Sequence, residues 1–170
     1  GFDSSTAFKL TRLEKNFRSS AAIVRALQTV ASKYPTVGLQ DNWGDFSADS
    51  ATGEGDRPVA AGFATEEGML KQVADIVAAS VASGKQPSDI AILGFSEALL
   101  ERVVKSLRDA GQKVTLLEGT GRGGPKRAVV VGDARHAKGQ QFDTVILVGL
   151  DRDSLPDLTD ISNPLHAETK

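Results

Sequence analysis

Three basic side chains and a glycine lie close together in one short polar segment: Arg135, His136, Lys138 and Gly139. Apolar, β-branched runs at 128–131 and 144–150 flank this segment, and their nearly continuous apolar character is typical of parallel strands covered on both faces. Ligands of parallel sheets bind at the carboxyl ends of the strands. Since glycine permits close approach of the backbone, the segment predicts a site for an anionic ligand, with a solvated basic turn as the alternative.

The elements that must position this segment alternate between strand and helix. Apolar patterning predicts extended segments or strands at 8–13, 58–63, 89–95, 113–117, 128–131 and 144–150. Apolar residues at helical spacing predict three helices, which begin after Ser19 or Ser20, after Thr65 and after Ser96. They end before Pro35, Gly84 and Gly111. Repeated β-α-β units with right-handed crossovers predict an α/β fold of three layers, with a mainly parallel sheet between helices.

Composition limits the class of protein. The length of 170 residues suits a single domain, 1–170. The segment at 35–57 is rich in Gly, Asp, Ser and Asn, a composition that predicts a mobile loop. Lysine and arginine number 20 against 22 aspartates and glutamates, which excludes a generally cationic nucleic-acid binder and leaves only local contact with nucleic acid. Without cysteine and with two distant histidines, we expect no metal site.

Two further expectations concern location and completeness. No apolar run has the length of a membrane span and the amino end lacks a signal pattern, so we expect a cytoplasmic protein without membrane contact. The chain starts without methionine and ends in an uncapped, helix-like segment, so we expect a piece excised from a longer protein.

Two glycine motifs have to be considered for nucleotide binding. Residues 119–124 match G-x-G-x-x-G, but Pro125 and a strand follow where the dinucleotide fingerprint needs a helix, so we predict a flexible hairpin-like connector. The P-loop signature is absent, because the Gly84-Lys85 pair is followed by Gln86. This chain therefore cannot cradle a triphosphate alone, and a phosphate loop with its Mg²⁺ carboxylate would have to come from another domain.

Two segments resemble motifs of one family. Residues 13–20, LEKNFRSS, followed by a helix, resemble the fourth motif of UvrD/Rep-type superfamily 1 helicases. Residues 137–143, AKGQQFD, resemble the fifth motif of that family, usually A-K-G-L-E-F-D. The order of the two motifs and the elements between them also match. The resemblance implies the second, C-terminal RecA-like domain of such a helicase, in a piece that lacks the P-loop.

The region between the two motifs is short. Many family members carry a large insertion there, whereas only 117–129 is available here, which is similar to helicase IV and to HelD-type motors that act on RNA polymerase. The alignment also places Asp133 and Arg135 at the Thr and His positions of the T-x-H sequence that contacts single-stranded DNA. The short region and the departure from T-x-H together make the chain most similar to a HelD-type bacterial protein.

The resemblance also implies roles for individual residues around ATP and Mg²⁺. Phe17 matches the aromatic that stacks on the nucleotide base, and Arg18 matches the arginine that contacts the γ-phosphate. Arg18 is the catalytic candidate, because a guanidinium stays charged and presents several donors in one plane. Gly139 and Gln141 match positions near the ribose, and Lys138 is a candidate phosphate contact. The Mg²⁺ would be held mainly by an N-terminal RecA-like domain of the same protein.

Partners and alternatives follow from the same comparison. Asp133, Arg135 and His136 are candidates for contact with single-stranded DNA, and RNA polymerase is a candidate protein partner. The sixth motif does not occur before Lys170, so we expect the isolated chain not to hydrolyse ATP. One alternative is a noncatalytic interaction module that docks through the 35–57 loop and its Trp43. A third is a small-nucleotide enzyme that uses the 119–124 glycines.

Overall fold

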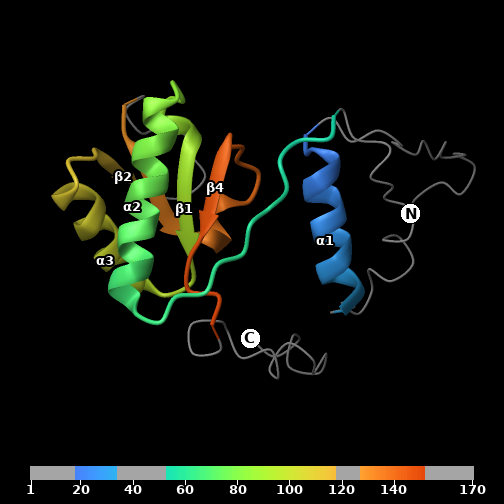
Figure 1. The fold of residues 1–170 in the computed structure, drawn as a ribbon, viewed down its shortest axis with the longest axis horizontal. Helices are drawn as coiled ribbons and strands as arrows, with labels where there is room; N and C mark the ends of the chain where they lie inside the picture. Colours follow the sequence, from blue (N-terminus) through green and yellow to red (C-terminus); the bar gives the residue numbers. More distant parts are fainter. Residues whose placement is uncertain (1–17, 34–52, 118–126, 152–170) are drawn as a thin grey trace, which may run out of the picture. The chain divides into compact units, whose positions relative to one another are not determined.

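A computed structural model describes residues 18–33, 53–117 and 127–151 of the chain (Figure 1). The chain divides into two compact units, Gly1–Gly62 and Phe63–Lys170, each of which has its own internal contacts. The predicted extended segment at 8–13, most of the predicted 35–57 loop with Trp43, and the glycines at 119–124 lie outside the described residues.

The first unit contains one helix, α1 (Ala21–Lys33), among its described residues. The helix is described as far as Lys33, and the end that the sequence predicts before Pro35 borders residues outside the description. Its first backbone amides are satisfied from a distant segment, since Ala21 N–H donates to the Gly53 carbonyl at 2.8 Å and Ala22 N–H to the Glu54 carbonyl at 3.0 Å. An ion pair between Arg25 and Glu54 joins the same two segments.

The segment at 53–64 has no regular secondary structure, so the strand predicted at 58–63 is wrong. Every residue from 53 to 63 is exposed, and Val59 retains 92% of its accessible surface. The four described strands of the sheet pair with one another and not with this segment. An apolar segment forms a strand only where the backbone of a neighbouring strand hydrogen-bonds with it, and Pro58 has no backbone N–H to donate.

Two helices of the second unit begin and end where the sequence predicts. In α2 (Glu66–Ala82), the Thr65 hydroxyl accepts from Gly68 N–H at 3.1 Å. In α3 (Glu97–Asp109), the Ser96 hydroxyl accepts from Leu99 N–H at 3.4 Å. Gly84 and Gly111 follow these helices with φ of 94° and 79°, a left-handed conformation that glycine adopts without strain.

Four parallel strands form the sheet of the second unit, in the order β2-β3-β1-β4. They are β1 (Ile90–Gly94), β2 (Val114–Leu116), β3 (Val129–Asp133) and β4 (Thr144–Leu147). The α/β fold with a parallel sheet is therefore confirmed. The hairpin-like connector between β2 and β3 is wrong, because a hairpin joins antiparallel strands and these two run parallel.

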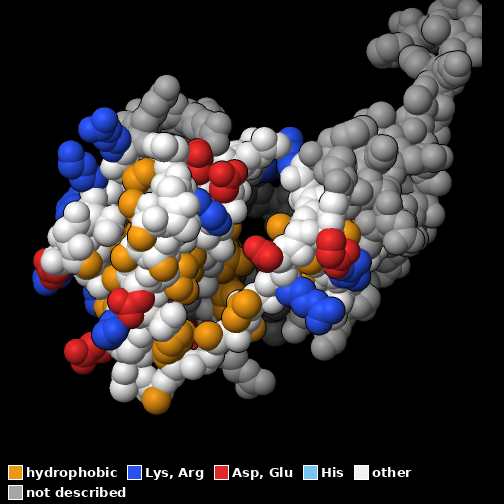
Figure 2. Space-filling view, turned by 45° about the horizontal axis from the view of Figure 1, so that its top comes forward, with side chains coloured by type: hydrophobic (Ala, Val, Ile, Leu, Met, Phe, Trp, Pro, Cys, Tyr) orange, Lys and Arg blue, Asp and Glu red, His pale blue; other side chains and the backbone are white. Residues whose placement is uncertain are grey.

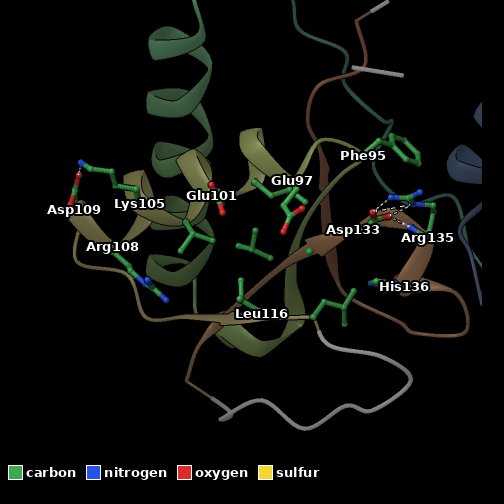
Figure 3. A pocket seen from close by; sticks show the side chains of 15 residues that line it. Phe95, Glu97, Glu101, Lys105, Arg108, Asp109, Leu116, Asp133, Arg135 and His136 are labelled. Carbon is green, nitrogen blue, oxygen red and sulfur yellow. Dashed lines mark hydrogen bonds and ion pairs between the residues drawn. The ribbon is translucent and has the colours of Figure 1, made fainter. Parts of the chain in front are cut away.

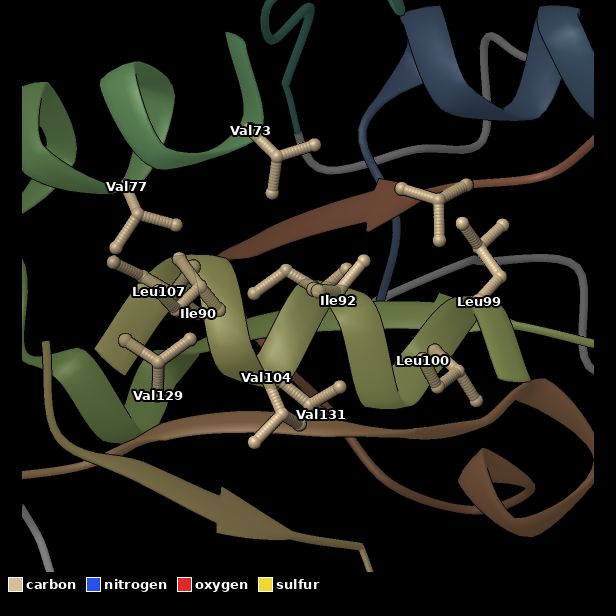
Figure 4. Packing of buried hydrophobic residues seen from close by; sticks show 12 residues of the cluster. Val73, Val77, Ile90, Ile92, Leu99, Leu100, Val104, Leu107, Val129 and Val131 are labelled. Atoms are coloured by element: carbon tan, nitrogen blue, oxygen red, sulfur yellow. The ribbon is translucent and has the colours of Figure 1, made fainter. Parts of the chain in front are cut away.

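The main core lies between one face of the sheet and both α2 and α3 (Figure 4). Its most deeply buried side chains are Val77, Ile90, Ile92, Val103, Leu107, Val129 and Val131. Burying a side chain of this kind contributes about 1.5–3 kcal/mol, so this layer dominates the stability of the unit. On the other face, Ala91, Leu93 and Leu117 pack with partly buried residues that include Val130 and Phe142.

β4 differs from the prediction that its apolar run is covered on both faces. Val145 and Leu147 remain 49% and 52% exposed, whereas Ile146 packs against the main core. β4 pairs only with β1 among the described strands, so it forms an edge of the described sheet. A continuous apolar run therefore marked the strand correctly but did not reveal its position in the sheet.

Candidate functional site

The basic segment lies at the carboxyl end of the sheet, as the sequence predicts. Asp133, the last residue of β3, is in register with Gly94, the last residue of β1. A short 3₁₀ helix, η4 (Ala134–Ala137), follows β3 directly, and the turn that contains Lys138 and Gly139 comes after it. Polar groups thus project from the end of the sheet at which parallel α/β folds bind their ligands.

Asp133 and Arg135 engage one another. The Asp133 carboxylate accepts the Arg135 backbone N–H at 2.8 Å and caps η4. It also accepts from the Arg135 guanidinium, through Nε at 2.9 and 3.0 Å and through Nη2. This charged hydrogen bonding lowers the pKa of Asp133 to about 2. Two of the three residues predicted to contact DNA are therefore an ion pair, and the third, His136, is exposed beside them.

The pair leads to a pH-dependent prediction. Since the folded-state pKa of Asp133 lies below its ordinary 3.8, its carboxylate stabilises the fold fully above pH 4 and loses this effect as the pH falls toward 2. Arg135 is 69% exposed and solvent screens the pair, so we expect Asp133→Asn to lower the urea midpoint only slightly at pH 7.

Urea unfolding at pH 7, 4 and 2.5 measures this difference. Asparagine can still cap η4, so the substitution isolates the charge. The gap between the parent and the variant should close below pH 4, whereas Asp56→Asn, at an exposed site, should show no such gap. A gap of the same size at pH 2.5 would show that the charge of Asp133 is not its source.

Lys138, Gly139 and Gln141 share one exposed turn, so the structure brings together three of the five predicted nucleotide contacts. Gly139 has φ of 84°, and an added Cβ would meet no atom within 4 Å. Glycine is needed there for its backbone conformation, and the space around the turn is open.

The other two predicted contacts are Phe17 and Arg18. Phe17 lies outside the described residues. Arg18 is exposed and lies three residues before Ala21, the first residue of α1, in the first unit, whereas the Lys138 turn lies in the second. That Arg18 and the turn form one ATP site therefore stays a prediction.

The sequence matches one known protein family. A model of the UvrD-like helicase C-terminal domain matches residues 11–121, well over half of the chain. The chain belongs to this family. The match includes Arg18 and runs through β2, and it confirms the predicted superfamily 1 helicase-type domain. Neither curated proteins nor solved structures gave a match.

In this UvrD-like C-terminal domain, the Lys138 turn lies beyond the matched residues, so its likeness to the fifth motif rests on its own sequence. No three His, Asp or Glu side chains in the described part of the chain are grouped so that they could hold a metal ion. No helix described in the structure combines the length and apolar composition needed to cross a bilayer.

Gln140, which the sequence reasoning did not single out, has an unusual environment. Its side-chain Nε2 is buried and has no hydrogen-bond partner among the described residues. The UvrD-like fifth motif usually has leucine at this position. A buried amide nitrogen without a hydrogen-bond partner loses its hydrogen bonds to water and gains none in return, which destabilises the fold.

We therefore expect Gln140→Leu to stabilise the domain by about 1 kcal/mol, because it replaces an unsatisfied amide with an apolar group of similar size. The urea midpoint at pH 7 measures the gain. Gln72→Leu, at an exposed position of α2, is the matched control and should change stability by less than about 0.5 kcal/mol. A lower midpoint for Gln140→Leu would show that the amide is satisfied in solution.

A groove lies beside the Asp133–Arg135 pair, between α3, β2 and the end of β3, with a volume of about 750 Å³ (Figure 3). The sequence carries no direct signal for this groove, because its walls come from elements that only the fold brings together. Its floor is apolar, formed by Leu100, Val104, Leu117 and Val131. On the face shown in Figure 2, acidic and basic side chains are interspersed over the described surface.

Proposed function

We propose that this domain completes the ATP site of a superfamily 1 motor and couples hydrolysis to movement between two RecA-like domains. In this proposal, an N-terminal RecA-like domain binds Mg²⁺ and most of the triphosphate, and this domain contributes Arg18 and the turn with Lys138, Gly139 and Gln141. The observation that carries the proposal is an exposed Arg18 three residues before α1, within the residues that match the family.

The residues present suit a shared site. Arg18 is exposed and lies three residues before α1, and a guanidinium presents several donors to phosphate oxygens. The turn at Gly139 is exposed, and open space surrounds the position of an added Cβ, so the turn can approach a ribose. Gln141 can hydrogen-bond a sugar but lacks the carboxylate of the family motif. Phe17 is the proposed contact to the base.

Charge explains how such a site moves two domains. Bound ATP supplies the free energy of phosphate hydrolysis. Arg18 pairs with the terminal phosphate only while that phosphate is present, so its release removes the ionic contact that holds the domains together. Chemical energy becomes movement through the gain and loss of this one pair. ATP turnover with Arg18 intact or replaced, in a protein that carries a P-loop domain before this one, tests the proposal.

The proposed track is single-stranded DNA, and a HelD-type role at RNA polymerase is the related proposal. The short connection between β2 and β3 supports the HelD-type comparison, because it leaves no room for the large insertion. Arg135 is paired with Asp133, so His136 is the remaining candidate for a DNA contact at this turn.

A noncatalytic interaction module is the second candidate function. Its support is the ion pair that takes up two candidate DNA contacts, together with the glutamine at position 141. ATP turnover that does not change when Arg18 is replaced would favour it.

A further inference from the structure

We propose that the groove between α3 and β2 binds a peptide segment of a partner protein that carries apolar side chains, with lysine or arginine at one end and an acidic residue at the other. This inference is independent of ATP, because the groove contains neither Arg18 nor Lys138. It rests on the shape of the groove, its apolar floor and the unpaired charges along its rim.

The groove is long. Its lining on α3 extends from Glu97 to Asp109, which corresponds to about 18 Å along a helix. Four apolar side chains, each at most 9% exposed, line its base, and Leu116 of β2, 55% exposed, extends the apolar surface to the edge of the sheet. A groove of this length suits an extended or helical peptide that inserts apolar side chains at regular spacing.

The rim carboxylates Glu97 and Glu101 form no ion pair or hydrogen bond with the described residues, although Glu101 interacts electrostatically with its neighbour Arg102. They are one helical turn apart on the same side of α3, where like charges repel. Figure 3 shows both beside the groove. A cationic side chain placed near them would relieve this repulsion, so the two carboxylates specify a lysine or arginine in the partner.

The other charges of the rim define the rest of the partner. Lys105 pairs with Asp109 at 2.7 Å, and Arg135 pairs with Asp133. Of the three lysine and arginine side chains on the rim, Arg108 alone forms no ion pair with the described residues. It lies at the opposite end of the groove from Arg135 (Figure 3). An acidic residue at the corresponding end of the peptide would pair with it.

Nucleic acid fits this groove less well. Four carboxylates line it against three permanent cations, and two of those cations already have carboxylate partners. A phosphate backbone is bound by several free cations that displace its counterions. The balance of charge therefore favours a peptide.

Fluorescence anisotropy with the 170-residue chain tests the proposal. The probe is a labelled 14-residue peptide with leucines at helical spacing, two lysines at one end and one glutamate at the other. We expect it to bind at least about tenfold more tightly than the same peptide with glutamates in place of the lysines. Glu97→Gln/Glu101→Gln should weaken binding of the lysine peptide by about tenfold, and Leu116→Ser should also weaken it.

The matched control is Asp56→Asn/Glu67→Gln, which removes two exposed carboxylates that do not line the groove and should leave binding unchanged. Circular dichroism and the urea midpoint verify that each variant folds. Equal binding of the lysine and glutamate peptides would overturn the proposal. So would unchanged binding by the glutamine pair, or tighter binding of a 12-nucleotide single-stranded DNA that is lost with Arg108→Gln.

Discussion

Arg18→Ala is expected to lower ATP turnover at least about 100-fold when this domain follows a P-loop-bearing RecA-like domain. The reason is electrostatic, because a guanidinium aimed at the transferring phosphate stabilises charge that develops in the transition state. Arg18 is exposed and precedes α1 by three residues, so its removal leaves no cavity in the core. Steady-state ATP hydrolysis measures the loss, and the decrease should fall mainly on kcat.

Two further variants sharpen this experiment. Arg18→Lys keeps the charge but loses the planar fork, so we expect turnover between those of the parent and the alanine variant. Arg57→Ala removes another exposed arginine of the same unit and should leave turnover within about twofold of the parent. If Arg18→Ala hydrolysed ATP at the parental rate, the noncatalytic interaction module would become the better account of this domain.

Local signals account for the parts of the fold that were predicted correctly. The three helices were found because hydroxyl caps, proline and glycine act within a few residues, as Thr65, Ser96 and Gly111 show. The errors concern pairing between distant segments. The pattern at 58–63 could not reveal that no described strand pairs with it, and the run at 144–150 could not reveal an edge strand.

The candidate site was likewise predictable only where local sequence signals determine it. Its position after β3 could be predicted, because strand ends and turn residues are visible in the sequence. The cap formed by Asp133 was not predicted, although a carboxylate before a helical turn is a recognisable cap. The groove and the buried amide of Gln140 depend on tertiary packing, so the sequence carried no direct signal for either.

Gly132→Ala is expected to destabilise the domain by about 2–3 kcal/mol, because the core has no space for one more methyl group. An added Cβ would lie 2.4 Å from the Leu117 Cβ, and 3.3 Å from both the Cα and the backbone nitrogen of Leu117. The backbone cannot easily move away, since Leu117 N–H donates to the Val131 carbonyl at 2.9 Å. Glycine is therefore required where the end of β2 approaches β3.

Urea unfolding of Gly132→Ala and of a matched control, Gly62→Ala, measures this cost. An added Cβ at Gly62 would meet nothing within 4 Å, so that variant should change stability by less than about 0.5 kcal/mol. The clash can also be isolated in a double-mutant cycle, because Leu117→Gly removes the atom that the new methyl group meets. Gly132→Ala should then cost less in the Leu117→Gly background than in the parent. Equal costs in the two backgrounds would place the source of the destabilisation elsewhere in β3.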